Sequence, residues 1–361
     1  MEPVNKIQLK ANISRDTLSL EYKQKIRNKA VIIILVIILI AIFFLSFTIG
    51  RYAISLPELM NIFVGKLLSL HVTWDETVET VLFNVRIPRI VAAILIGAAL
   101  SSSGAAYQGL FKNPMVSPDI LGASAGAGFG AALAIVLSLN IVGIQLSAFL
   151  IGMTAVIFTY TISNIIGKGN NVVLVLILTG MVVSTLFSSF ISVTKYVADP
   201  ESKLPAITFW LMGGLSSIRT KDTLILLIPF FLGIVPLFLL RWKLNVLSFG
   251  EEEAQAMGID TGKVRLIIIT CSTLLTASAV SICGIIGWIG LIIPHITRLL
   301  VGPNYKVLLP VSMLIGSIFL LLVDDIARTT FVMEVPLGIL TSIIGAPFFI
   351  YLLLKSNRRS I

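Results

Sequence analysis

Residues 31–50 read VIIILVIILIAIFFLSFTIG, a run without a single charged side chain. A helix needs about 20 apolar residues to cross the hydrocarbon core of a bilayer, and this run is long enough. Comparable runs follow at 87–110, 122–139, 145–166, 172–195, 222–241, 263–283, 286–300, 307–327 and 335–354. Backbone groups inside hydrocarbon must be satisfied within their own segment. The runs therefore predict an all-α polytopic membrane protein with about ten transmembrane helices.

The composition supports this fold class. Of the 361 residues, 57% are hydrophobic and only 12% are charged, whereas soluble domains carry about 25% charged residues. The net charge of +9 is spread over the ends of the apolar runs, where basic residues set membrane topology. We therefore expect membrane lipid, and no nucleic acid, around this chain. Cys271 and Cys283 lie inside apolar runs and indicate neither a disulfide framework nor a metal site.

The basic residues also predict the orientation. Ten spans place both termini on one side, and most Lys and Arg fall on that side, so the N- and C-termini are expected in the cytoplasm. No A-x-A-like cleavage site follows the first apolar run, which predicts an uncleaved first span. The expected organisation is a basic cytoplasmic segment (1–30), a single transmembrane domain (31–355) and a cytoplasmic tail (356–361).

One polar stretch interrupts the apolar sequence. Residues 248–265 read SFGEEEAQAMGIDTGKVR and connect the sixth and seventh spans on the cytoplasmic side. Ser248 and Glu251 match the S-x-x-E capping box, which predicts a helix that opens at Ser248. Glutamates in the first turns of that helix suit its dipole. Gly258 is placed to end it and Asp260 to cap the next span.

This short helix would present a small apolar surface made by Ala254, Ala256 and Met257. On these residues alone, two interpretations stay open. The loop is either a contact site for another protein or an ordinary solvated connection.

Three further stretches, in order, carry a family resemblance. They are RIPRIVAAILIGAALSSSGAAYQGLFKNPMVSPDILGASAGAGFGAA (86–132), GIIGWIGLIIPHITRLLVGPNYKVLLP (284–310) and EVPLGILTSIIGAPFFIYLLLK (334–355). Over roughly residues 50–355 the chain resembles the FecCD family of ABC-importer permeases, which carry iron–siderophores, haem or vitamin B12. The resemblance implies a ten-helix permease domain in the cell membrane. It also implies a second permease subunit, either a copy or a paralogue, two ATPase subunits below, and a substrate-binding protein outside.

The resemblance implies a role for the polar stretch as the cytoplasmic coupling loop (248–262), which transmits closure of the ATPase dimer to the spans. Its ATPase-coupling residues would be Glu251, Glu252, Glu253, Ala254, Met257 and Gly258. The chain holds no G-x-x-x-x-G-K-[ST] sequence. We therefore expect no catalysis, cofactor or metal in this chain, and ATP with Mg²⁺ in the partner ATPase.

Three arginines lie at the outer ends of expected spans: Arg86 and Arg89 before the second, and Arg328 after the ninth. They could be interfacial anchors. The resemblance instead implies docking to acidic residues of the binding protein, for which bidentate guanidinium groups are suited. Asp324 precedes Arg328 by four residues and would pair with it. Alternatively, Asp324 and Asp325 are ion or proton sites, because acids inside a membrane are often functional.

The resemblance also implies that the substrate passage is bordered by the tenth span, by the helix after the fifth span, and by the fifth span itself. Its segment LTGMVVSTLFSSFIS (178–192) is mildly polar and uncharged. The predicted lining residues are Ser184, Thr185, Ser188, Ser189 and Ser192. Hydroxyls within a helix also bond the carbonyl four residues earlier, and both interpretations stay open. Elsewhere, the repeat of Gly122, Gly126 and Gly130 favours close helix packing, and the lone His295 predicts no metal site.

Together these features predict the permease subunit of an ATP-driven importer for a bulky metal chelate. A ferric siderophore is the preferred substrate, with haem and cobalamin as rivals. An ion-gradient-driven secondary transporter would call for charged midplane residues and broken helices, yet the first seven spans are nearly free of acids. A membrane enzyme would need convergent His, Asp or Glu side chains, and the two histidines lie far apart in sequence.

Overall fold

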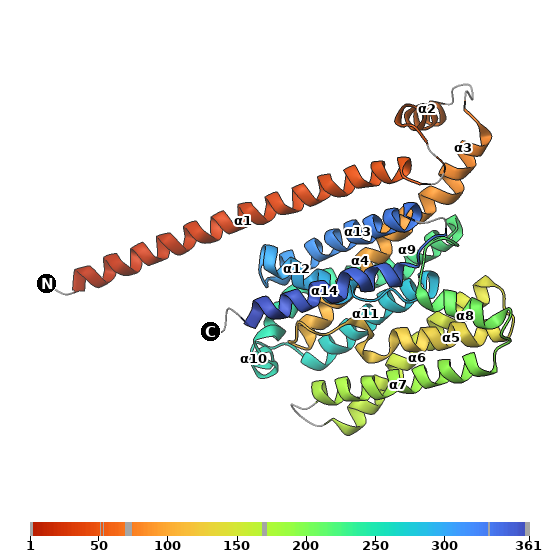
Figure 1. Cartoon of the computed structure of the whole chain (residues 1–361). Coiled ribbons are helices and arrows are strands. Elements are labelled where there is room, and N and C mark those ends of the chain that lie inside the picture. Colours follow the sequence, from red (N-terminus) through yellow and green to blue (C-terminus); the bar gives the residue numbers. More distant parts are fainter. Residues whose placement is uncertain are drawn as a thin grey trace.

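The computed structural model describes residues 3–50, 52, 54–68, 74–167, 172–330 and 333–357, and within those ranges the chain is helical without strands (Figure 1). The elements are α1 (Pro3–Thr48), α2 (Leu56–Leu67), α3 (Glu76–Thr80), the π-helix η1 (Val81–Arg86), α4 (Ile87–Leu110), the 3-10 helix η2 (Pro118–Leu121), α5 (Ala123–Val136), α6 (Ile141–Ile166), α7 (Val172–Val197), α8 (Lys203–Met212), α9 (Thr220–Phe249), α10 (Glu251–Ala256), α11 (Thr261–Cys283), α12 (Ile289–Val301), α13 (Tyr305–Thr329) and α14 (Leu337–Asn357).

Every expected span falls on an apolar helix. Seven segments among the described residues are long and apolar enough to cross a membrane, and they lie in α1, α3 to α4, α6, α7, α9, α11 and α13. The shorter apolar helices α5, α12 and α14 occupy the three other expected spans. The all-α membrane fold is confirmed. The number of crossings and the side on which the termini lie stay predictions.

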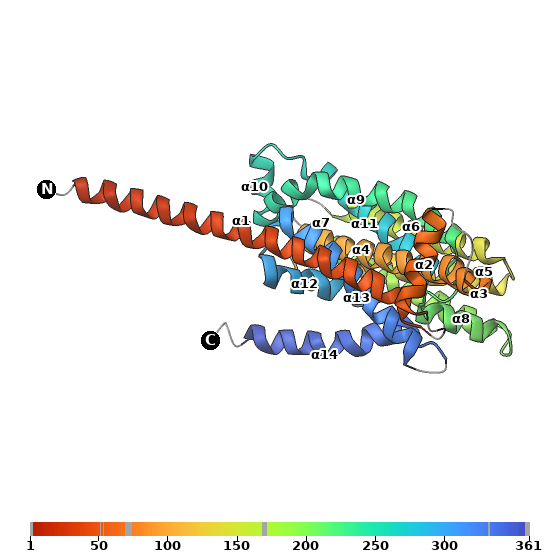
Figure 2. The ribbon, with the colours of Figure 1, turned by 90° about the horizontal axis from the view of Figure 1, so that it is seen from above.

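The helix α1 continues through the boundary expected at residue 30. It runs unbroken from Pro3 to Thr48, and its N-terminal part extends beyond the other helices (Figures 1 and 2). From Tyr22 onward its side chains are mostly exposed, including Ile33, Ile37 and Ile40. Apolar side chains that face outward are expected of a helix surrounded by lipid.

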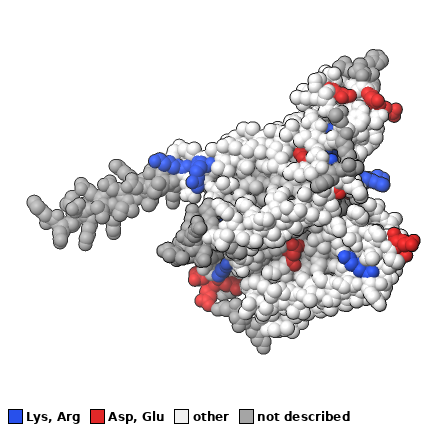
Figure 3. Space-filling view, viewed as in Figure 1, with Lys and Arg blue, Asp and Glu red and all other residues white. Residues whose placement is uncertain are grey.

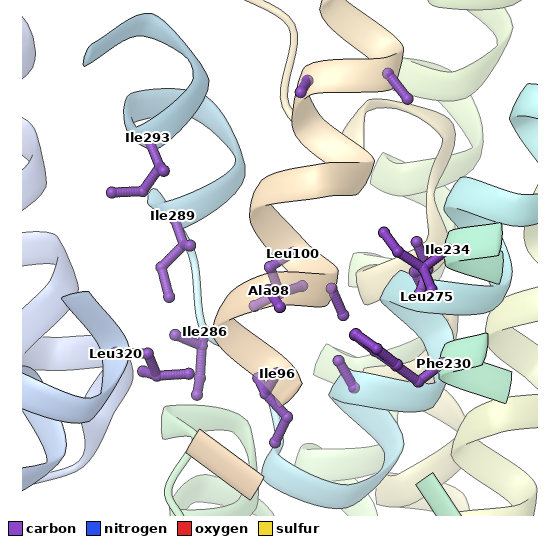
Figure 4. Packing of buried hydrophobic residues seen from close by; sticks show 14 of the residues in the cluster. Ile96, Ala98, Leu100, Phe230, Ile234, Leu275, Ile286, Ile289, Ile293 and Leu320 are labelled. Carbon is purple, nitrogen blue, oxygen red and sulfur yellow. The ribbon is translucent and has the colours of Figure 1, made fainter. Parts of the chain in front are cut away.

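The helix α4 forms the centre of the bundle, and it packs against α9, α11, α12 and α13. Figure 4 shows Ile96 and Leu100 of this helix between two groups of apolar side chains. Ile289 and Leu320 lie on one side, and Phe230 lies on the other. Because α4 is surrounded, nearly every residue from Ile96 to Leu110 is buried, including three consecutive serines.

Glycines allow α4 to approach its neighbours closely. A Cβ atom at Gly104 would lie 1.9 Å from the carbonyl oxygen of Gly290 in α12, and one at Gly97 would lie 2.2 Å from that of Gly316 in α13. Small residues at such crossings let helix backbones touch.

We expect Gly104→Ala to destabilise the protein by about 3 kcal/mol, the upper end for overpacking, because backbone atoms stand where the methyl group must go. Thermal stability of the detergent-solubilised protein, followed by size-exclusion chromatography, measures the loss. Gly287→Ala is the matched control, since a Cβ atom there meets nothing within 4 Å. Equal stability of the two variants would show that the α4–α12 contact is looser than described.

Candidate functional site

The loop between α9 and α11 contains a short anchored helix, α10. The helix α9 continues through Phe249, and Gly250 is the N-cap of α10. The Ser248 hydroxyl donates to the Asn245 carbonyl at 2.6 Å within α9. The predicted capping box is therefore wrong, because Ser248 is still part of the preceding helix. The loop proper covers 250–260, shorter than the expected 248–262.

The end of this loop follows the sequence prediction. Gly258 has a φ of 77°, the left-handed conformation that ends a helix. Asp260 caps α11 by accepting the backbone N–H of Lys263 at 3.0 Å. That bond and the Lys263 ammonium group lower the pKa of Asp260, so the cap is held in its charged form.

The two faces of α10 differ. Ala254 is 0% exposed and Ile259 is 6% exposed, so both pack inward. Glu251 forms an ion pair with Arg265 of α11. Met257 is 60% exposed, and Glu252 and Glu253 are also exposed. Figure 3 shows acidic side chains gathered at the end of the molecule where α10 lies.

This arrangement corrects the prediction that Ala254 forms part of an exposed apolar surface. Ala254 anchors α10 to the body of the protein and adds nothing to the exposed apolar surface, to which Met257 makes the large contribution.

A cavity of about 440 Å³ borders the loop and is lined in part by Lys112, Gly250 and Arg265. Sequence reasoning missed Arg265, because only the fold brings it to Glu251.

The three arginines expected at the outer ends of spans are buried. Arg86, Arg89 and Arg328 are 4%, 5% and 5% exposed, so they are not interfacial anchors. The Arg89 guanidinium binds Asp324 at 2.8–3.0 Å and Glu334 at 2.9–3.0 Å. The predicted pair of Arg328 with Asp324 is present at 3.3 Å.

The same cluster holds the C-terminal end of α1. Arg328 donates to the Ile49 carbonyl at 3.0 Å and the Ser46 carbonyl at 3.3 Å. Arg86 donates to the carbonyls of Phe47 and Tyr52. The bonds to Ser46 and Phe47 satisfy carbonyls that the end of a helix leaves unpaired, and those to Ile49 and Tyr52 hold the chain that follows it.

Asp325 belongs to the same network of hydrogen bonds and ion pairs as Asp324. It accepts the Ser46 hydroxyl at 2.7 Å and pairs with Arg328. Within the described ranges, no group of three His, Cys, Asp or Glu side chains is placed to hold a metal ion. The paired carboxylates of Asp324 and Asp325 have structural partners, which favours the ion-pair interpretation over ion or proton sites. Sequence reasoning missed Glu334, because no local spacing connects it with Arg89.

The predicted passage residues lie on α7. Hydroxyls of four of them donate to the carbonyl four residues earlier, at 2.8–3.0 Å, and all four side chains are exposed; they are Thr185, Ser188, Ser189 and Ser192. The Ser184 hydroxyl is buried and has no partner among the described residues. The backbone bonding is thus confirmed for these four, while lining of a passage stays a prediction.

Comparison with known proteins decides the family. The pattern of the FecCD transport family matches residues 38–355, nearly the whole chain. The chain belongs to the FecCD transport family. This FecCD protein is therefore an ABC transporter permease and a multi-pass protein of the cell membrane. The resemblance drawn from the three stretches is confirmed.

Curated relatives align over most of the FecCD permease. The molybdate import system permease MolB of Haemophilus influenzae is 41% identical, with 90% of this chain and 95% of that one covered. A probable iron chelatin transport permease of Helicobacter pylori is 39% identical, with 90% and 98% covered. A solved metal-chelate-type ABC transporter in an inward-facing conformation superposes with a TM-score of 0.82 at 39% identity, covering 91% of this chain and 99% of that one.

Proposed function

We propose that this FecCD permease is the membrane subunit of an ATP-driven importer, and that an ATPase subunit binds its loop 250–260. The observation that carries this proposal is that the short helix α10 has one side anchored to the protein and one side exposed. Ala254 and the Glu251–Arg265 pair fix the helix on one side, and Met257 is exposed on the other. A loop that only joined two spans would need no anchored helix with an exposed apolar side chain.

The assembly in this proposal divides the work among several chains. Two permease subunits, identical or paralogous, form the passage, and two ATPase subunits bind and hydrolyse ATP with Mg²⁺. An external substrate-binding protein delivers the substrate. This permease performs no catalysis and binds no cofactor; it transmits the movement of the ATPases from α10 to the spans, which alternate between outward and inward access.

The substrate in this proposal is a bulky metal chelate, most simply a ferric siderophore, with haem and cobalamin as rivals. Molybdate is a second candidate, because the permease that is 41% identical is named for molybdate import. Uptake of radiolabelled ferric siderophore and of radiolabelled molybdate, compared between cells with and without this permease, separates them. Loss of one uptake and not the other assigns the substrate.

The energy source separates this proposal from an ion-gradient-driven transporter. Uptake is expected to stop when cellular ATP is depleted and to persist when an ionophore collapses the ion gradients while ATP is maintained. The reverse pattern would support secondary transport and overturn the proposal.

Docking of the binding protein is assigned to the outer region around Arg86, Arg89 and Arg328. Among these, Arg89 is the arginine that an outside carboxylate reaches most directly. Its second partner, Glu334, has a side chain that is 31% exposed, whereas Arg86 and Arg328 bind carbonyls at the end of α1.

The passage is assigned to the exposed hydroxyl face of α7, where Thr185 and Ser189 line a shallow hollow. We expect phenylalanine at both positions to lower uptake by about ten-fold or more, since transporter selectivity depends on the width of the passage. Valine at Thr185 with alanine at Ser189 is the matched control. That variant removes hydroxyls which only bond their own helix, so uptake should stay within about two-fold. Normal uptake in the phenylalanine variant would remove this face from the passage.

A further inference from the structure

Arg89 binds two carboxylates that differ in their surroundings. Asp324 is completely buried and accepts three bonds from the guanidinium group. Glu334 accepts two bonds from the Nη1 atom, and its side chain is 31% exposed. One partner is therefore closed off from solvent, whereas the other can be approached from outside.

The charge balance makes Glu334 the replaceable partner. Without Glu334, Arg89 would still be paired with Asp324, so this guanidinium group would keep a counter-ion. Without Asp324, both Arg89 and Arg328 would lose the carboxylate they share. Release of Glu334 is therefore the less costly change, and it exposes a positive group to any carboxylate nearby.

Glu334 ties the segment before α14 to Arg89 of α4, beside a backbone bond that also holds the start of this helix. It stands three residues before Leu337, whose backbone N–H donates to the Gly213 carbonyl at 2.9 Å. Beyond that point α14 is lightly packed: only Leu337, Thr341 and Gly345 are buried among its described side chains. Figures 1 and 2 show α14 on the outside of the helical bundle. Beyond its first turn, few buried side chains therefore hold α14 to the bundle, and the contacts at its start carry more of its attachment.

The ion pair borders a cavity. Arg89 and Glu334 line a space of about 340 Å³ together with Trp210, Gly214 and Cys283, among others. A Cβ atom at Gly214 would meet nothing within 4 Å, so the cavity is open at that point. Both partners of the Arg89–Glu334 pair thus line the space through which a carboxylate would approach.

We propose that Glu334 is an internal substitute for a docking carboxylate: it holds the outer start of α14 on Arg89 until an acidic side chain of the external binding protein takes its place and frees the helix. The identity of that partner rests on the proposed function. The displacement itself depends only on the contacts of Arg89, Glu334 and α14.

The native thiol of Cys283 reports on this displacement, because it is 3% exposed and lines the same cavity. The experiment uses right-side-out membrane vesicles that contain the full chain with Cys271→Ala, and a membrane-impermeant maleimide. We expect Glu334→Gln to accelerate labelling of Cys283 about five-fold, the change that loss of a part-exposed ion pair produces. Glu201→Gln, which alters an exposed glutamate between α7 and α8, should leave the rate unchanged.

Hexaglutamate serves as the carboxylate probe, with hexaglutamine as its uncharged control. Hexaglutamate is expected to accelerate labelling in the protein that keeps Glu334, and to add nothing in Glu334→Gln. Because the first half of this arm needs no change at Glu334, it remains decisive even if Glu334→Gln fails to fold. The proposal is overturned if hexaglutamate has no effect, or if it accelerates labelling equally with and without Glu334.

These outcomes are independent of the proposed importer function. If labelling shows no displacement while an ATPase co-purifies with the chain, only the role of Glu334 is wrong. If labelling shows displacement and no ATPase is found, the assembly is wrong and the movement of α14 stands.

Discussion

Replacing Asp324 with asparagine is expected to destabilise the protein by about 3–5 kcal/mol, because a buried charge pair loses one partner. Asp324 is 0% exposed and binds both Arg89 and Arg328. Asparagine has nearly the same shape, but it leaves two buried guanidinium groups with too little negative charge. The midpoint of thermal unfolding in detergent, together with the yield of monodisperse protein, measures this loss.

Glu334→Gln is the matched control for this prediction. It removes one carboxylate from the same arginine, but the pair is part-exposed and Arg89 keeps Asp324. The expected cost is below about 1 kcal/mol. If Asp324→Asn were no less stable than Glu334→Gln, the cluster would not depend on Asp324 as its central counter-ion.

Replacing Met257 with glutamate is expected to prevent stable association with the ATPase. Met257 directly follows α10, is 60% exposed and is the large apolar side chain that this loop presents. A charge at the centre of an apolar contact costs about 2 kcal/mol or more, roughly a thirty-fold loss of affinity. The amount of ATPase retained during affinity purification and the rate of uptake both measure this effect.

Met257→Leu is the control, since leucine keeps an apolar side chain of similar volume and should retain assembly and uptake. Because Met257 contributes little to the interior, both variants should also unfold at the wild-type temperature. Wild-type assembly and uptake in Met257→Glu would mean that α10 is not the ATPase contact.

Features with a local physical cause were predictable from sequence. The thickness of a bilayer sets the length of an apolar run, and each expected run falls on a helix. Gly258 ends its helix and Asp260 caps the next, because turn and cap chemistry depends on neighbours in the chain.

Features that depend on distant residues were missed. Near the end of α9, Asn245 accepts the backbone N–H of Tyr305 at 2.7 Å, a contact between residues 60 positions apart. The burial of Arg89 depends on Asp324, which lies 235 positions away. A pairing of this kind arises only when α4 and α13 pack together.

The central claim is that a separate ATPase binds the loop 250–260 from the cytoplasm. Affinity purification of the full chain in a mild detergent, followed by an ATPase assay of the purified material, tests it most directly. The expected result is a co-purifying ATPase subunit whose hydrolysis is sensitive to vanadate and which is lost from the Met257→Glu protein. A purified chain that imports solute into liposomes with no nucleotide-hydrolysing partner would contradict it.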